Sequence, residues 1–252
     1  MENAESIQIH LNSEYASSYN NLHYSDCDFT TSLIQISDKY TIYLSVVNAV
    51  IPYSFYNINS TNNELFYQEL TTPVTNTTLL IPYGNYNVNQ LVTYMSQNLP
   101  RTNVSYDPIK NKLTFVNSTN DFKILTQYSS CQNLLGVSTN DLYNTSIGQS
   151  LTLSRQINLA NNQMIQIATN FQSGSISNIN NHDMKVLCSF PSVKNPYSLI
   201  EFNNNTNYKI NLNNNIFNSI NIKLLNQDGN LLELNQQYFS ITLQLDIINF
   251  VD

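Results

Sequence analysis

The sequence is poor in the residues from which catalytic sites and nucleic-acid-binding surfaces are built. Its 252 residues include ten Lys and Arg, three His, five Gly and no Trp, and the formal net charge is −7. Ten cations on an acidic chain are too few to neutralise a run of phosphates, so we expect no direct binding of DNA or RNA. With so few glycines, the sequence contains no Gly-rich loop of the kind that cradles phosphate groups.

Cysteines and long apolar runs are also scarce. Cys27, Cys131 and Cys188 are odd in number and far apart, and no Cys-x-x-Cys pattern occurs. The sequence therefore predicts neither a disulfide framework nor a zinc site, and we expect reduced, mutually unpaired thiols. No run approaches the roughly 18 apolar residues of a membrane span. The opening stretch MENAESIQIHL lacks the apolar segment of a signal peptide.

Asparagine takes the place of charge. The chain has 43 Asn, and charged residues make up 11%, which is less than half of the usual share of about 25%. Apolar residues make up 41%, which is enough for a sizeable core at this length. The polar surface is therefore expected to consist of neutral amide and hydroxyl groups. Such a surface repels copies of itself weakly, which favours self-association.

Most of the sequence alternates between apolar and polar residues with the period of a β-strand. In the segment FSITLQLDI, residues 239–247, every odd-numbered residue is apolar. We therefore expect Leu243 in the core and Gln244 on the opposite face of this strand. Asp228 and Gly229 stand between two apolar runs and predict a hairpin turn. Further strands are expected at residues 6–11, 33–36, 41–51, 164–168, 185–190, 208–212 and 220–225.

A central part of the chain mixes helical and strand signals. Asn87 stands in the N-cap position of a helix, Gln90 follows three residues later, and Pro100 ends the apolar residues at helical spacing. A shorter helical turn at 129–135 is expected to end at Gly136. A hairpin of residues 103–106 with 112–116, and a strand at 121–125, are expected between these helices. We therefore predict an inserted α+β subdomain at residues 61–145, within a β-sandwich made from residues 1–60 and 146–252.

One phrase occurs twice near the start of this block. IPYSFYNIN at residues 51–59 and IPYGNYNVN at residues 81–89 share Ile-Pro-Tyr, Tyr-Asn and a final Asn. Proline lacks a donor and belongs at a strand end or sheet edge, and Asn tolerates turns and helix caps. We interpret the phrases as structural boundaries of the inserted block. The alternative is a ligand-binding role for their tyrosines.

No combination of residues marks an active site. His10 lies in an expected strand and His23 in an expected loop, and the adjacent pair His182 and Asp183 would point apart on an extended chain. The motif SDCDF at residues 25–29 puts two carboxylates beside a thiol, which is not the spacing of a known metal motif. None of the sequence motifs of hydrolases, metalloproteases or nucleotide-binding enzymes occurs. We therefore predict no catalytic, cofactor-binding or metal-binding residues and no enzymatic activity, although a site assembled from distant positions leaves no such signal.

Tyrosines are the other chemical resource of the chain. There are 17, and two groups stand out, namely Tyr15, Tyr19 and Tyr24, and then Tyr53, Phe55 and Tyr56. Aromatic residues interleaved with Asn and Ser are typical of hydrated protein–protein contacts. The same residues can also stack on sugars.

Five segments in this order resemble capsid proteins of eukaryotic DNA viruses. They are LSVVNAVIPYSFYNIN, LLIPYGNYNVNQLVTYM, NKLTFVN, CQNLLGV and INIKLLNQDGNLLELNQQYFSITLQLDI. The chain is most similar to the penton or minor capsid proteins of virophages, polinton-like viruses and their giant-virus relatives, over about residues 6–250.

The resemblance implies a jelly-roll β-sandwich, which in this family sometimes carries an inserted domain, and it supplies no catalytic or cofactor-binding residues. It implies a homo-pentamer at icosahedral vertices, with the major capsid protein and other minor capsid proteins as partners. It also implies location in the virion after assembly in the host cytoplasm. It leaves open whether the chain is the vertex protein or one that cements hexagonal capsomers. The alternative from the residues alone is a carbohydrate- or receptor-binding β-sandwich of a virion spike.

Overall fold

Strands account for most of the regular structure. The computed structural model describes residues 4–19, 24–69, 73–119, 122–138, 143–145, 148–160, 164–171, 185–213 and 215–249. The chain divides into two compact units. The first, here called the frame, consists of Met1–Phe55 with Asn162–Asp252, and the second, the inserted unit, is Tyr56–Asn161.

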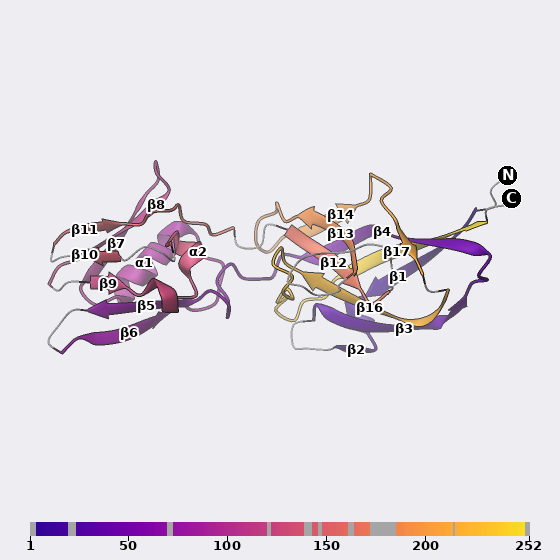
Figure 1. Ribbon diagram of the computed structural model, residues 1–252, viewed down its shortest axis with the longest axis horizontal. Coiled ribbons are helices and arrows are strands. Elements are labelled where there is room, and N and C mark those ends of the chain that lie inside the picture. Colours follow the sequence, from indigo (N-terminus) through magenta and orange to yellow (C-terminus); the bar gives the residue numbers. More distant parts are fainter. Residues whose placement is uncertain are drawn as a thin grey trace. The chain divides into compact units, whose positions relative to one another are not determined.

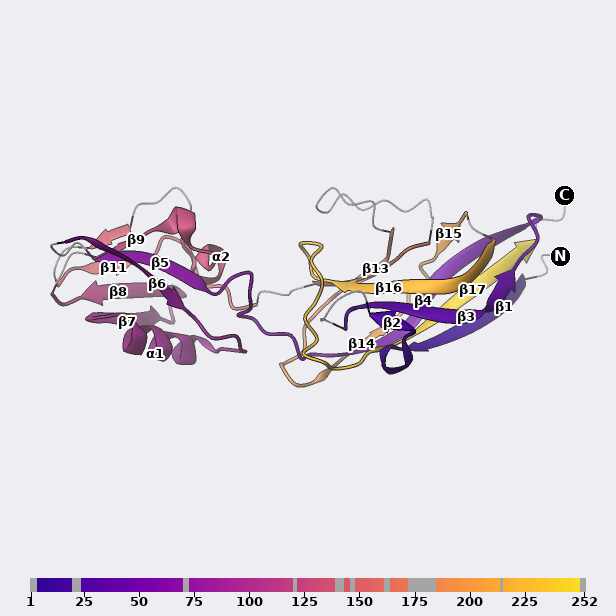
Figure 2. The ribbon, with the colours of Figure 1, turned by 90° about the horizontal axis from the view of Figure 1, so that it is seen from below.

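In the part of the frame that the structure describes there are two antiparallel sheets, which Figures 1 and 2 show as two layers of strands. The first sheet has the order β1 (Ala4–Asn12), β17 (Ser240–Asn249), β4 (Tyr40–Pro52) and β14 (Leu199–Asn203), and β15 (Ile210–Leu212) also pairs with β4. The second sheet has the order β13 (Lys185–Pro191), β12 (Met164–Thr169), β16 (Ile216–Leu225), β3 (Asp26–Gln35) and β2 (Ser18–Tyr19). A 3-10 turn at Ser13–Tyr15 follows β1.

This strand order is that of a jelly roll, as the resemblance to capsid proteins implied. If the eight main strands are lettered B to I along the chain, the first sheet reads B-I-D-G and the second reads C-H-E-F. The inserted unit lies between strands D and E, that is, between β4 and β12. The frame is therefore formed by two stretches of sequence that the insertion separates.

The core of the frame follows the strand period. Along β17 the residues Ile241, Leu243 and Leu245 are at most 1% exposed, while Gln244 and Asp246 lie half-buried on the other face. The predicted register of this strand is confirmed. It lies between β1 and β4, with Ile9 and Val46 as the partners of Leu243. Ala4 pairs with Ile248, so the start of β1 lies beside the end of β17.

One expected hairpin forms only in part. The turn around Gly229 is present, since the Asn226 amide donates to Asn230 O over 2.8 Å. The second apolar run is not a strand, because after a single bridge between Leu225 and Leu231 it enters the core, where Leu234 is fully buried. This run packs into the core and does not form the second strand of the hairpin that the sequence predicted.

The described residues of the inserted unit form two small antiparallel sheets and two helices. One sheet has the order β10 (Tyr143–Thr145), β9 (Phe122–Ile124), β5 (Glu64–Glu69) and β6 (Thr75–Leu80). The other has the order β11 (Ser150–Thr152), β8 (Lys112–Asn117) and β7 (Thr102–Asp107). The helices are α1 (Val88–Asn98) and α2 (Gln132–Leu135), and a 3-10 turn lies at Thr126–Tyr128.

Both helices begin or end as the local sequence predicts. The Asn87 side chain accepts from the Gln90 amide and the Gln90 side chain accepts from the Asn87 amide, each over 2.9 Å. This reciprocal pair satisfies two donors that the first turn of α1 would otherwise leave free. Gly136 ends α2 at φ 83°, in the left-handed region that favours glycine. A Cβ there would lie 2.5 Å from the carbonyl oxygens of Arg155 and Gln156.

The inserted unit is wider than the expected block at residues 61–145. At its start, fully buried Ile58 forms a bridge with Gly84. At its end, Leu153 and Ile157 are buried in the core of this unit, and their amides donate to carbonyls at the β7–β8 hairpin. These residues lie in irregular backbone, where neither strand nor helix period marks membership of a core.

The two copies of the repeated phrase lie against each other. The amide and carbonyl of Ile58 exchange hydrogen bonds of 3.1 and 3.0 Å with those of Gly84. The side chain of Asn57 donates to Tyr86 O and accepts from the Tyr86 amide, over 2.8 and 2.9 Å. The Asn57 amide in turn donates to the side chain of Asn85. These contacts support the interpretation of the phrases as structural boundaries.

Candidate interaction surfaces

The titratable side chains do not gather into a site within the described part of the chain. His10 lies on β1, where its Nδ1 is 3.1 Å from the hydroxyl of Thr242. His23 and the pair His182 and Asp183 lie outside the described residues. Among the described residues, no group of three or more His, Cys, Asp or Glu side chains is placed to hold a metal ion. No helix among them is long and apolar enough to cross a membrane.

The three cysteines are free thiols in low-polarity surroundings. Burial raises the pKa of Cys27, Cys131 and Cys188 to about 12, and at Cys27 the carboxylates of Asp26 and Asp28 add to this effect. A thiol needs to ionise to act as a nucleophile, so these groups are unreactive at neutral pH.

The SDCDF motif separates into two faces of β3. Cys27 is fully buried, while Asp26 and Asp28 point to the other face. The side-chain amide of Asn221 on β16 donates to both carboxylates over 2.9 Å, and Lys223 lies 3.3 Å from Asp26. The two carboxylates are therefore bound by protein groups and connect β3 to β16.

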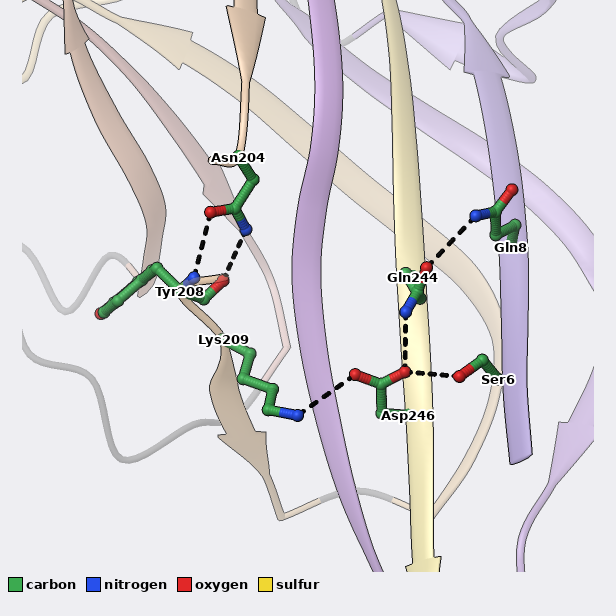
Figure 3. A network of polar contacts seen from close by, with 7 residues as sticks. All are labelled: Ser6, Gln8, Asn204, Tyr208, Lys209, Gln244 and Asp246. Atoms are coloured by element: carbon green, nitrogen blue, oxygen red, sulfur yellow. Dashed lines mark hydrogen bonds and ion pairs between the residues drawn. The ribbon is translucent and has the colours of Figure 1, made fainter. Parts of the chain in front are cut away.

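The outer face of the first sheet is a polar ladder, as Figure 3 shows. Ser6 donates to Asp246 over 2.6 Å and Gln8 to Gln244 over 3.2 Å, in both cases from β1 to β17. Gln244 also donates to Asp246 over 2.8 Å. Lys209, which precedes β15, reaches the other oxygen of Asp246 at 3.4 Å. This one carboxylate thus receives donors from its own strand and from two segments that are distant in sequence.

These donors control the charge of Asp246. Partial burial alone would raise its pKa, but the hydrogen bonds from Ser6, Gln244 and Lys209 outweigh burial and lower the pKa below its ordinary value. The ammonium group of Lys209 also lies 5.2 Å from the centre of the Tyr43 ring on β4. The ladder therefore keeps its charges paired within the sheet.

Beside the ladder, one asparagine closes the link from β14 to β15. The side chain of Asn204 donates to Tyr208 O over 2.8 Å and accepts from the Tyr208 amide over 3.0 Å (Figure 3). This fixes the turn that places Lys209 next to Asp246.

The tyrosine groups named from the sequence are only partly available to a ligand. Tyr19 and Tyr24 have ring centres 4.8 Å apart and tilted by 51°, and Tyr238 packs edge-on against Tyr24 at 76°. Tyr15 is 77% exposed and stands apart from this cluster. In the first copy of the phrase, Phe55 is buried in the core of the frame, with the ring of Tyr53 stacked on it at 4.3 Å.

Three large exposed side chains instead lie within seven residues of sequence, in the link between β13 and β14 and at the first residue of β14. Val193, Tyr197 and Leu199 are 80, 85 and 54% exposed. Hydrogen bonds between the backbone of Tyr53 and that of Tyr197 and Ser198 fix this link to the end of β4. We call these three residues the β13–β14 patch. Sequence reasoning missed it, although Val193 between two prolines, and Tyr197 directly after the second, lie outside any alternating pattern and were a signal.

Comparison with known proteins finds similarity in structure and none in sequence. No protein-family model and no curated protein sequence matches the chain. The crystal structure of the selenomethionine-labelled mavirus penton protein is similar over 96% of this chain and 99% of its own, with a TM-score of 0.52 and 12% identity. The cryo-EM structure of the Sputnik virophage contains a chain that matches over 96% and 98%, with a TM-score of 0.43 and 11% identity. The second match is too distant to carry an argument.

At such low identity the mavirus protein shows the fold alone, but it shows it over nearly the whole length of both chains. The resemblance to virophage penton proteins that the sequence motifs indicated is confirmed at the level of the fold.

Proposed function

We propose that the chain is a structural protein of a viral capsid, either the vertex (penton) protein or another minor capsid protein. In this role it associates with copies of itself, contacts the major capsid protein and other minor capsid proteins, and becomes part of the virion after assembly in the host cytoplasm. The observation that carries the proposal is the similarity to the mavirus penton protein along almost the whole chain.

The chemistry of the surface supports the same role. The polar ladder presents neutral amides and hydroxyls, and its one carboxylate, Asp246, is already paired with Lys209. Covering such a surface with a neighbouring protein therefore costs little desolvation free energy. The β13–β14 patch adds exposed apolar and aromatic area, which is enriched at the centres of protein interfaces. We assign this patch to the contact between copies.

The described residues also fit a role without catalysis. The cysteines have raised pKa values and the acidic pair Asp26 and Asp28 is bound by Asn221. The carbohydrate-binding alternative receives less support, because the rings of Tyr19, Tyr24 and Tyr238 are tilted against one another and form no flat platform for a sugar.

The mass of the assembled protein tests the proposal. Native mass spectrometry and negative-stain electron microscopy over a range of concentrations should show closed fivefold rings. Tyr197→Ala combined with Val193→Asp should abolish the rings without unfolding the frame, while Tyr15→Ala, at an exposed tyrosine outside the patch, should leave them intact. A trimer that binds glycans would contradict the proposal and favour a spike.

A further inference from the structure

Strand β6 is the edge of a sheet and lacks the features that protect edge strands. Among the described residues, only β5 pairs with it. Its sequence, TNTTLL, has no charge and no proline, and its register with β5 runs from Thr75 to Leu80 without a bulge. Charges, prolines, bulges and short length are the usual means by which proteins prevent an edge from pairing with another chain.

The other edges in the inserted unit are protected. The edge of β7 is covered by α1, because the hydroxyl of Ser96 accepts from the Val104 amide over 2.9 Å and donates to Val104 O over 3.1 Å. The edge strands β10 and β11 are only three residues long. At six residues, β6 is therefore the long open edge of the described part of this unit.

The hydrogen bonds show which backbone groups of β6 are open. The Ile81 amide donates to Asn63 O over 2.9 Å, so every second residue before Ile81 faces β5. It follows that the amides and carbonyls of Asn76, Thr78 and Leu80 point away from β5. The hydroxyl of Tyr94 on α1 donates to Leu80 O over 2.8 Å, which agrees with this direction and covers that end of the edge.

The side chains along the middle of this edge are neutral and partly apolar, and the carboxylates Glu64 and Glu69 lie on β5 opposite its two ends, Leu80 and Thr75. Leu80 is 56% exposed, Tyr128 is 59% exposed, and half-buried Phe66 lies between β6 and Tyr128, with ring centres of Phe66 and Tyr128 6.2 Å apart. Nearer the turn, Gln68 donates to Asn76 over 2.8 Å on the same face. A strand added to β6 would continue an apolar surface and meet no charge on β6 itself.

We propose that β6 pairs with β6 of a second copy of the chain, antiparallel and across a twofold axis. With Thr77 opposite its own copy, Asn76 of each chain lies opposite Thr78 of the other, and these residues exchange their open amides and carbonyls. The Leu80 carbonyl keeps its bond to Tyr94 in this register. A twofold contact places a patch against itself, and β6 is suited to this because its lack of charge leaves no like charges opposed.

This contact does not rest on the proposed capsid role. A fivefold ring repeats one head-to-tail contact and contains no twofold axis between its members. Pairing through β6 therefore joins two free chains or two rings. The mass of the assembly distinguishes this twofold pairing, which doubles the number of copies, from ring formation, which multiplies it by five.

Analytical ultracentrifugation of the full chain with Thr78→Pro tests the pairing. The Thr78 amide points away from β5, so proline there removes a donor from the open edge and leaves the β5–β6 ladder intact. Leu80→Lys places a charge beside the same edge. The matched control is Ile109→Lys, which adds the same charge at a 93% exposed residue of the inserted unit outside β6. Circular dichroism verifies that each variant is folded.

We expect the wild type and Ile109→Lys to sediment as two copies, or as ten where rings also form. Thr78→Pro and Leu80→Lys should give one copy, or five. A wild type found only as one copy or as five overturns the pairing, and five would at the same time support the capsid role. Folded variants that still sediment as two or ten copies also overturn it.

Hydrogen exchange gives the direct measurement. The amides of Asn76 and Thr78 should exchange at least tenfold more slowly in the paired wild type than in Leu80→Lys at equal concentration. Equal rates would contradict pairing through this edge.

Discussion

The frame and the inserted unit are built from contacts of very different range along the chain. In the frame, β1 pairs with β17, so that Ala4 lies opposite Ile248, and β3 pairs with β16. In the inserted unit, β5 pairs with β6 and β7 with β8 through short hairpins, and α1 is capped by its own sequence. Local contacts form quickly and at low cost in chain entropy, whereas distant ones form late. The inserted unit is therefore expected to fold first and independently, and four predictions test this contrast.

The largest effect is expected in the frame at Leu243. Leu243→Asp buries an unpaired charge between β1 and β4 and should abolish folding of the frame. Leu243→Ala should lower the free energy of unfolding of the frame by about 2–5 kcal/mol, as large-to-small core changes do. Hydrogen exchange read by mass spectrometry should show the inserted unit still protected in both variants.

The control for that site is Gln244→Ala, on the opposite face of β17, where the expected loss is within about 1 kcal/mol. A larger loss for Gln244→Ala than for Leu243→Ala would mean that the register is shifted by one residue.

The corresponding test in the inserted unit is Gly136→Ala. A Cβ at φ 83° costs about 1–2 kcal/mol by itself, and here it would also meet two backbone carbonyls at 2.5 Å. Gly148→Ala is the matched control, since Gly148 has φ 71° and nothing lies within 4 Å of an added Cβ. Urea unfolding should show a larger loss for Gly136→Ala, confined to the inserted unit. Equal losses would show that the close contact with residues 155 and 156 is unimportant.

A smaller, pH-dependent effect is expected from Asp246 and only in the frame. Its pKa in the folded protein lies below the unfolded value of 3.8, so its stabilising contribution is complete above that pH and is lost as the pH falls through the folded pKa. Asp246→Asn should therefore be less stable than the wild type at pH 7, and the difference should shrink as the pH falls below 3.8. A difference that stays constant across this range would show that the carboxylate charge is not responsible.

The smallest effect on the frame is expected from removal of the inserted unit. Replacement of Tyr56–Asn161 by a short flexible linker should leave the free energy of unfolding of the frame within about 1 kcal/mol of its value in the full chain. Removal of residues 61–145 alone should instead give an aggregating protein, because Ile58, Leu153 and Ile157 would lose the core in which they are buried. If both deletions give equally soluble and equally stable proteins, the inserted unit does not extend beyond residues 61–145.

The sequence predicted best the features that are determined locally. The capping pair Asn87 and Gln90, the left-handed Gly136 and the alternation around Leu243 each leave a signal within a few residues, and each was found where it was expected. The many alternating segments predicted a β-rich frame, and its jelly-roll topology followed from the resemblance to capsid proteins.

What depends on distant contacts left no such signal. Nothing near Asn57 indicates that its side chain binds the backbone of Tyr86, and Ile157 lies in irregular chain although it is buried. The run LLEL was expected to form a strand, but core burial decided its conformation. The open edge of β6 was hidden for a similar reason, since TNTTLL has a weak pattern and its exposure depends on which strands pair around it.

The position of β17 has a consequence for how the protein is made on the ribosome. This strand lies between β1 and β4, both of which are synthesised about two hundred residues earlier, and it is the link through which they belong to one sheet. Until residue 249 has left the exit tunnel, β1 has no partner and β4 has an open side. A nascent chain that terminates early therefore presents unpaired strands to chaperones and proteases, and only a chain translated through β17 completes the first sheet.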